Sequence, residues 1–107
     1  MTNGLANIEN LKSIHKTKEV DSSGALTLDA VGDVTISADG GNILMDNGTT
    51  TIFDFNVDDT SLTIHDDQDT GDKFSVTVDQ HGATTIATLD DDAAAAHLSL
   101  DVDGNIT

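Results

Sequence analysis

Carboxylates are the most numerous residues in this sequence whose chemistry could serve a function. The densest run, Asp66-Asp67-Gln68-Asp69-Thr70-Gly71-Asp72, offers several oxygen atoms within one short segment. Calcium binds about six to eight oxygen ligands, so it is the one cofactor that this run would suit. The candidate ligands are the four carboxylates of the run, Asp66, Asp67, Asp69 and Asp72.

The spacing of this run departs from that of an EF-hand calcium loop. With Asp66 in the first position, Gly71 falls in the sixth, where an EF-hand needs glycine. The third and fifth positions, however, hold Gln68 and Thr70, and the twelfth holds Thr77 instead of a bidentate Glu. The pattern therefore favours a solvated acidic turn over a specific calcium site.

The four histidines lie far apart in the sequence, at His15, His65, His81 and His97. None of them forms a His-x-His or His-x-x-x-His pair. In a homotrimer one inward histidine would become three around an axis, and three imidazoles can hold a transition metal. The isolated spacing favours exposed or strand-edge histidines over such a site.

No catalytic motif is present. Adjacent carboxylates, as in Asp58-Asp59 and Asp90-Asp91-Asp92, belong to acidic turns and do not by themselves indicate a cleft. The chain has 0 Cys, and it lacks a Gly-x-Ser-x-Gly sequence, a phosphate loop and a dinucleotide fingerprint. Its only aromatic residues are 3 Phe, which occupy alternating strand-like positions typical of a core. We therefore expect a protein that is not an enzyme.

The charge of the chain excludes two classes of partner. Lys and Arg number 4 against 20 Asp and Glu, which gives a formal net charge of -16. Nucleic acids and anionic membrane surfaces bind basic proteins, so we expect neither as a partner. Only 36% of the 107 residues are hydrophobic, below the roughly 45–50% of a typical globular domain, so one chain can build only a thin core.

Most of the chain after Gly24 alternates between apolar and polar residues. A period of two is typical of strands, and Gly, Asp and Asn separate the alternating stretches. We therefore predict an all-β fold of repetitive short strands. The predicted strand units are 24–30, 32–38, 41–46, 53–57, 62–64, 74–78 and 98–102. The run Ala93-Ala94-Ala95-Ala96 is predicted to be a turn or crossover, because acidic residues precede it and a strand unit follows.

Each unit offers too few apolar side chains to form a core of its own, so stacked units or neighbouring chains must cover that face. We predict that three chains share one core in an intertwined homotrimeric β-helix or β-prism-like shaft. The predicted core residues are Leu26, Leu28, Val34, Ile36, Ile43, Met45, Phe53, Phe55, Val57, Leu62, Ile64, Phe74, Val76, Val78, Ile86, Leu98, Leu100 and Val102.

Residues 1–23 differ in kind from the rest. Leu5, Ile8, Leu11 and Ile14 are spaced by three, and three of the four basic residues lie in this stretch. We predict a short helix that begins near Asn3 and an attachment or trimerisation role for residues 1–23. Residues 24–107 would then form the repetitive shaft, and the motif that begins at Gly32 returns at Gly104, so we expect the repeat to continue beyond residue 107.

Three stretches carry a family resemblance: Gly-Ala-Leu-Thr-Leu-Asp-Ala from Gly24, Gly-Asp-Val-Thr-Ile-Ser-Ala-Asp-Gly-Gly-Asn-Ile from Gly32, and His-Gly-Ala-Thr-Thr-Ile from His81. Over residues 15–107 the chain resembles the repetitive β-rich fibre and appendage proteins of marine tailed phages. The resemblance implies an extracellular homotrimeric fibre shaft on the virion surface. Such a shaft docks to a virion attachment protein through its N-terminal segment and carries a receptor-binding tip. The alternative is an extracellular bacterial adhesin or a calcium-binding β-roll module.

Overall fold

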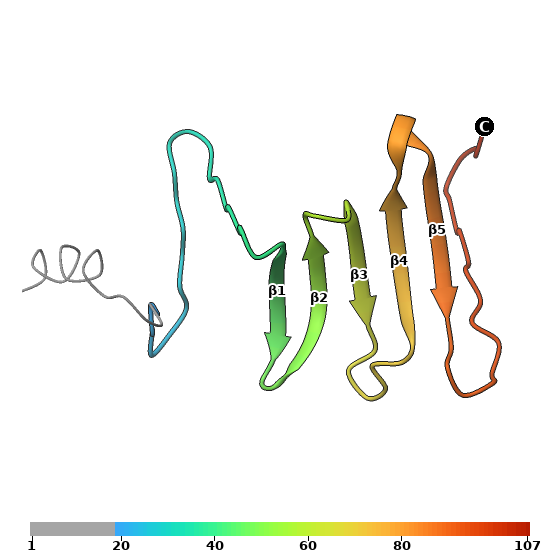
Figure 1. Cartoon of the computed structure of the whole chain (residues 1–107), viewed down its shortest axis with the longest axis horizontal. Coiled ribbons are helices and arrows are strands. Elements are labelled where there is room, and N and C mark those ends of the chain that lie inside the picture. The colour runs from blue at the N-terminus through green and yellow to red at the C-terminus, as the bar shows by residue number, and fades with distance from the viewer. Residues whose placement is uncertain (1–18) are drawn as a thin grey trace, which may run out of the picture. The chain divides into compact units, whose positions relative to one another are not determined.

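This computed structural model describes residues 19–107 of the chain. Their strands form one antiparallel sheet (Figure 1). The strands lie in the order β1-β2-β3-β4-β5, so each pairs with its neighbour in the sequence. They are β1 (Asn42–Asn47), β2 (Thr50–Asn56), β3 (Ser61–His65), β4 (Lys73–Val78) and β5 (Thr84–Leu89), and the 3-10 turn η1 (Gln80–Gly82) joins β4 to β5. No α-helix occurs within residues 19–107. The predicted all-β class is confirmed.

The chain divides into two units, residues 1–35 and residues 36–107, and the sheet lies in the second. A reverse turn precedes β1, in which the Gly41 N–H donates to the Ala38 carbonyl at 3.0 Å. The Gly41 carbonyl accepts the N–H of Val57 at 2.6 Å and so extends the β1–β2 pairing by one residue. With φ +96, Gly41 adopts a backbone conformation that only glycine tolerates well. It is the one buried residue among residues 19–107.

Polar turns connect the strands and are closed by their own side chains. Gly48, with φ +69, lies in the two-residue connection between β1 and β2. In the β2–β3 turn, Asn56 Oδ1 accepts the N–H groups of Asp58 at 3.1 Å and Asp59 at 3.0 Å. Asn and Asp favour turns because their side chains bond the backbone just ahead of them.

The register aligns the apolar side chains in two continuous rows. One row is Met45, Phe53, Ile64, Phe74 and Thr88, and the other is Ile43, Phe55, Leu62, Val76 and Ile86. Because successive residues of a strand point to opposite faces, both rows lie on one face of the sheet. The residues between them form a row on the opposite face, namely Leu44, Asp54, Thr63, Ser75 and Ala87.

A β-bulge interrupts the β1–β2 pairing just after these rows. Met45 lies opposite Phe53, but Asp46 lies opposite Thr51, so the register skips Ile52. Thr51 Oγ1 donates a hydrogen bond to Asp46 Oδ1 at 2.8 Å across the bulge. The regular alternation therefore extends along β1 from Asn42 to Met45.

Some predicted elements differ from the structure. The units at 24–30, 32–38 and 98–102 are not strands, because a strand needs a hydrogen-bonded neighbour and alternation alone does not supply one. Conversely, β5 was not predicted as a strand, since Ile86 is its only residue among the predicted core positions. Ala93–Ala96 begins as a bend and continues without regular secondary structure, with Ala93 at φ +83. The helix predicted near Asn3 lies outside the described residues.

Candidate functional site

The apolar face of the sheet is the most distinctive surface of the described chain. Its two rows contain no charged residue, although the whole chain carries a formal charge of -16. Val78 joins the same face, since it lies two residues after Val76 on β4. The sheet thus separates an uncharged apolar face from a polar one.

No apolar side chain of residues 19–107 is fully buried. Met45 is 54% exposed and Ile86 is 55% exposed, at the two edges of the face. The side chains of Phe53, Phe55 and Phe74 are half-buried. Complete burial of a large apolar side chain contributes about 1.5–3 kcal/mol, so this face leaves much of its hydrophobic free energy unrealised.

The predicted core residues fall into two groups. The face holds Ile43, Met45, Phe53, Phe55, Leu62, Ile64, Phe74, Val76, Val78 and Ile86. Outside the strands lie Leu26, Leu28, Val34, Ile36, Val57, Leu98, Leu100 and Val102, and all of these are exposed.

The opposite face is mostly polar, although it also carries Leu44 and Ala87, and it makes its own hydrogen bonds. Asn42 Nδ2 donates to Asp54 Oδ1 at 2.6 Å, which links β1 to β2 on that face. Thr63 and Ser75 lie opposite each other at its centre, and His65 lies opposite Lys73 at its end. This composition suits a surface that faces water.

The acidic β3–β4 loop uses its carboxylates to hold its own backbone. Asp66 Oδ1 accepts the N–H of Gln68 at 2.8 Å, and Asp69 Oδ1 accepts the N–H of Gly71 at 3.0 Å. The loop closes where the Asp66 N–H donates to the Asp72 carbonyl at 3.0 Å. The two side-chain contacts are Asx-type bonds, which are typical of a structural turn.

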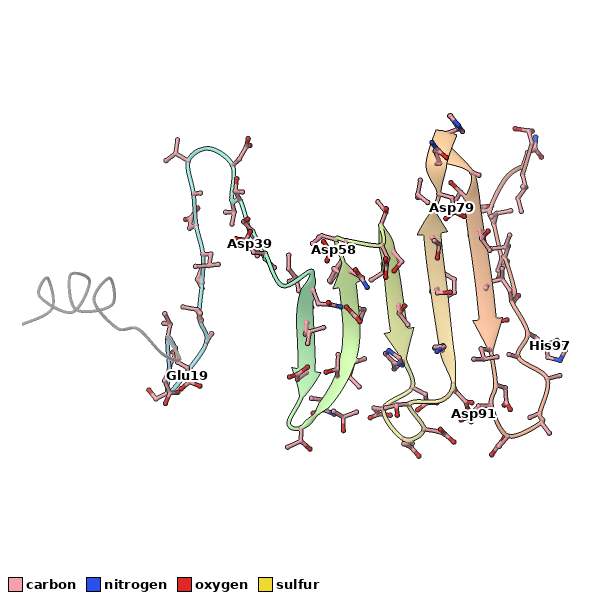
Figure 2. All side chains as sticks on the ribbon, in the orientation of Figure 1. Glu19, Asp39, Asp58, Asp79, Asp91 and His97 are labelled. Carbon is pink, nitrogen blue, oxygen red and sulfur yellow. The ribbon has the colours of Figure 1, made fainter. Side chains whose placement is uncertain are left out.

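A group of three carboxylates lies at this end of the sheet. Asp69, Asp72 and Asp91 each place one oxygen within 4.8 Å of the other two, and Asp91 lies at the end where β5 leaves the sheet (Figure 2). The Asp91 N–H donates to Asp72 Oδ1 at 3.3 Å. Gly71 leaves the necessary room, because a Cβ atom there would overlap the Asp91 carboxylate.

The three carboxylates fall short of a calcium cage. Calcium takes about six to eight oxygen ligands, whereas only three carboxylates lie together in this group. Of the predicted ligands, Asp69 and Asp72 belong to the group, and Asp66 and Asp67 do not. Asp91 was not predicted, although in an up-and-down sheet the turns after β3 and β5 must lie at the same end.

Mutual repulsion perturbs the ionisation of this acidic end. The Asp91 N–H lowers the pKa of Asp72, but desolvation and the charges of Asp90, Asp69 and Asp91 outweigh it, so the net pKa is raised. The hydrogen bond to Asp90 and the charge of Asp90 raise the pKa of Asp92, with smaller contributions from Asp72 and Asp69. Both carboxyls therefore take up a proton more readily than an isolated Asp.

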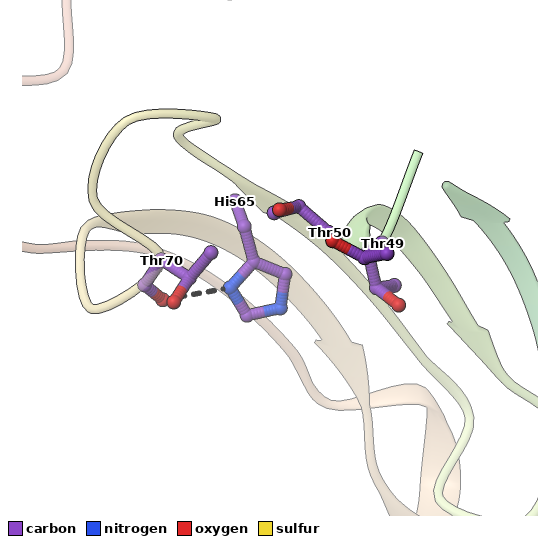
Figure 3. Close-up of a pocket in the computed structure, with 5 residues that line it drawn as sticks. Thr49, Thr50, His65 and Thr70 are labelled. Carbon is purple, nitrogen blue, oxygen red and sulfur yellow. Dashed lines mark hydrogen bonds between the residues drawn. The ribbon is translucent and has the colours of Figure 1, made fainter. Parts of the chain in front are cut away.

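A shallow pocket surrounds His65, lined also by Thr49, Thr50, Thr51 and Thr70 (Figure 3). His65 Nδ1 lies 3.0 Å from the Thr70 carbonyl oxygen. A carbonyl only accepts, so Nδ1 carries the proton, and in the neutral ring Nε2 keeps its lone pair. The pocket offers hydroxyl groups and one imidazole nitrogen, with no second histidine or carboxylate in its lining.

Of the other histidines, His97 lines a second shallow pocket together with His65, Asp66 and Asp72. His81 lies in η1 with φ +66, and His97 lies on the exposed segment after β5 (Figure 2). His15 lies outside the described residues. Within residues 19–107, no histidine belongs to a group of three potential metal ligands.

No family model, curated protein or solved structure matches this chain. No helix within residues 19–107 has the length and apolar character needed to cross a membrane.

Proposed function

We propose that this chain is a structural protein, a segment of a fibre shaft that assembles from copies of itself through the apolar face of its sheet. The observation that carries this proposal is the continuous, uncharged apolar face of the β1–β5 sheet, none of whose side chains is fully buried. Exposed apolar patches of this kind mark interaction surfaces in soluble proteins. A second copy offers the same face, and such a contact places no charge in the interface.

Three copies around one axis fit this face best. In a β-prism-like arrangement each sheet is one side and turns its apolar rows toward the axis, so each copy contacts both others. The chain has only 3 Phe and no Trp or Tyr, and modest branched side chains suffice where three copies meet. The polar faces then form the outer surface.

The charge distribution supports this arrangement. A long β-structure exposes edges that invite further pairing, and negative charge on its surface opposes lateral aggregation. In this chain the acidic residues concentrate in the turns at both ends of the sheet, for example at Asp58 and Asp79 at one end and Asp91 at the other (Figure 2). Copies can therefore meet through their apolar faces while their turns repel other assemblies.

The biological setting of the proposal is an extracellular fibre or appendage of a tailed phage. We propose this setting because the repeats resemble those of phage fibre proteins and because repeated strands suit a mechanical role. The shaft would link the virion to a distal receptor-binding tip, with residues 1–23 as the docking or trimerisation segment. It would have no catalytic activity, no cofactor, and no nucleic acid or membrane as a partner.

A calcium-binding β-roll fits the sheet less well. The β-roll is a coil of parallel strands that calcium holds together, whereas every strand pair of this sheet is antiparallel. We therefore expect the fold and the assembly to persist in the presence of a calcium chelator. Loss of the far-UV strand signal on chelation would favour the β-roll instead.

Light scattering on the purified chain tests the assembly. We expect a mass of about three times 11.1 kDa. Leu62→Lys places a charge at the centre of the apolar face and should reduce the mass toward that of one chain, whereas Thr63→Lys, next to it on the opposite face, should not. A stable folded monomer of the unmodified chain at micromolar concentration would refute the proposal. A dimer mass would indicate that two sheets pack face to face as a sandwich and would rule out the three-sided prism.

A further inference from the structure

The outer edge of β5 carries backbone groups that have no ladder partner within residues 19–107, because β5 is terminal in the strand order. The Asp79 N–H donates to the Ala83 carbonyl at 2.7 Å, so these two residues form a hydrogen-bonded pair next to the β4–β5 ladder. Such pairs alternate along an antiparallel ladder. The backbone groups that face away from β4 are therefore those of Thr84, Ile86 and Thr88. No Lys, Pro or charged residue along β5 guards this edge.

The chain that leaves β5 turns back toward this edge. Asp90 Oδ1 accepts the N–H groups of Asp92 at 3.1 Å and Ala94 at 3.0 Å, which closes the turn. Beyond the turn, Thr88 Oγ1 donates to the Ala96 carbonyl at 3.0 Å. The chain then runs in the direction opposite to β5 (Figure 1). The Thr88 side chain thus holds Ala96 beside a residue whose backbone faces outward.

Ala96 already lies at the end of one apolar row. It lines a shallow pocket together with three members of that row: Ile64, Phe74 and Thr88. The register places these three residues side by side on β3, β4 and β5. The segment therefore begins at the position that a sixth strand would take on this face.

Residues 96–100, Ala-His-Leu-Ser-Leu, have the alternation of a strand but no ladder partner within residues 19–107. Leu98 is 48% exposed and Leu100 is 63% exposed. Ordering a segment costs conformational entropy, and burial offsets this cost only when the apolar side chains of the new strand are covered. In a single chain, whose apolar face is open, these two leucines gain little from pairing with β5.

The contact between Thr88 and Ala96 sets a register that suits the apolar face. An antiparallel strand with these two residues opposite each other forms three pairs at the outward groups of β5: Thr88–Ala96, Ile86–Leu98 and Thr84–Leu100. Ala96 and Leu98 would then extend the two apolar rows, while His97 and Ser99 would lie on the polar face. The β4–β5 register has no bulge, and no other backbone hydrogen bond of residues 19–107 occupies the outward side of β5.

We infer that residues 96–100 of each copy add to the outer edge of its own β5 as a sixth strand when other copies cover the apolar face. The inference rests on the proposed self-assembly and adds a conformational step to it. Coverage of the face buries Leu98 and Leu100 against the neighbouring copies, which offsets the entropy of ordering the segment. The new strand also covers the β5 edge, which would otherwise be open to unrelated strands.

Amide hydrogen exchange tests this closure, because the N–H groups of Ile86 and Thr88 gain hydrogen-bond partners only if the strand forms. In the assembled chain we expect both amides to exchange at least about tenfold more slowly than in the Leu62→Lys chain, whose introduced charge should keep the copies apart. Ala87, whose N–H faces β4, should be protected in both samples and shows that the variant is folded. Leu44 is the control at the opposite edge, since the same alternation places its N–H on the outer side of β1.

The exchange of the Leu44 amide should stay fast in both samples. Equal exchange of Ile86 and Thr88 in the assembled and the Leu62→Lys chains would overturn the inference. Equal slowing of Leu44 on assembly would also overturn it, because it would indicate contact between the sheet edges of different copies.

A disulfide tests the register, since the chain has 0 Cys of its own. In the inferred register Thr85 lies opposite Ser99 on the polar face, with Cα atoms about 4.5 Å apart, which is within disulfide range. A chain with both Thr85→Cys and Ser99→Cys should form an internal disulfide when the assembled protein is oxidised. The matched control combines Thr85→Cys with Leu100→Cys, whose side chains would point to opposite faces, and should link much less.

The disulfide experiment needs no variant that separates the copies. Equal linkage of the two double variants, or linkage in neither, would mean that the segment does not pair in this register. A disulfide between two chains would mean that the strand comes from another copy. Each of these results overturns the inference. Light scattering on the unmodified chain separates them from a failure of the proposed function, since a trimer mass would leave the shared apolar core in place.

Discussion

The carboxylate of Asp58 lies over the α-carbon of Gly41: a Cβ atom on Gly41 would stand 2.6 Å from Asp58 Oδ2 and 3.1 Å from its Cγ. The next residue back from Asp58, Val57, donates its N–H to the Gly41 carbonyl. The turn after β2 thus packs on the turn before β1. This contact requires both the missing side chain and the positive φ of glycine.

Replacement of Gly41 by Ala should destabilise the sheet. The φ of +96 is strained for any L-residue, and strain of this kind costs about 1–3 kcal/mol. Gly40→Ala is the matched control, because its Cβ would meet nothing within 4 Å, and we expect little change or a slight gain. Urea unfolding monitored by circular dichroism measures both. Equal midpoints for the two variants would contradict the strained turn.

A second prediction compares the two faces of the sheet within one strand. Val76 and Ser75 are neighbours on β4, and both are half-buried in the single chain. If the proposed assembly buries this face, Val76→Asn should cost about 2–5 kcal/mol per chain, because it removes an apolar group and places an amide in the proposed shared core. Ser75→Asn should cost about 0.5–1 kcal/mol at most. Thermal melting at equal chain concentration gives the comparison, and a larger shift for Ser75→Asn would reverse the assignment of the faces.

A third prediction concerns the segment outside the sheet. Ile36 is 62% exposed in the single chain and Thr35 is also exposed, so an isolated chain should tolerate Asn at either position. If Ile36 belongs to the core of the proposed assembly, as the sequence predicted, Ile36→Asn lowers the melting temperature strongly and Thr35→Asn does not. Melting temperatures of the two variants at several protein concentrations provide the test. Indifference to Ile36→Asn would remove this residue from the core.

The acidic end of the sheet gives a pH prediction. A carboxyl whose pKa is raised by folding above its ordinary value of 3.8 binds protons more tightly in the folded state. Its stabilising contribution is full below that ordinary value and is lost as pH rises through the raised pKa. Asp92→Asn mimics the protonated form and keeps a donor for Asp90. We therefore expect it to raise the melting temperature at pH 7, by an amount that fades as the pH falls toward 3.8.

Asp101→Asn is the control for this pH effect. It removes the same formal charge, but Asp101 is outside the carboxylate group and is exposed. Its effect should be smaller at neutral pH and should change less with pH. The local repulsion around Asp90 and Asp92 would be disproved if both variants gave the same melting curves at every pH.

Alternation with bulky apolar residues located the central strands, but the same alternation at 24–30, 32–38 and 98–102 is not a strand. The predicted units at 53–57, 62–64 and 74–78 overlap β2, β3 and β4, and the unit at 41–46 overlaps β1. β5 was not predicted, because its sequence has small or polar residues at most positions: Thr84-Thr85-Ile86-Ala87-Thr88-Leu89. Its strand character comes from pairing with β4, which alternation cannot reveal.

The kinds of residue that form the apolar face and the carboxylate group could be predicted from the sequence, but their arrangement in space could not. The sequence indicated which side chains are apolar, yet the two rows depend on a register that the turns set, beginning with Asn47 opposite Thr50. No feature of the sequence predicted the bulge at Met45 and Asp46. Asp91 joined Asp69 and Asp72 through the up-and-down strand order, a long-range relation that the local sequence does not contain.

The sequential strand order also has a kinetic consequence. Every pairing in the sheet joins strands that follow each other along the chain, and proteins rich in such local contacts close short loops and fold quickly. Each chain would therefore form its sheet as a unimolecular event, before it meets another copy. Burial of the apolar face would follow at a rate that rises with protein concentration. In the proposed assembly, the chain would be most vulnerable to misassembly between these two events, so the yield of correctly joined copies would depend on the speed of the encounter.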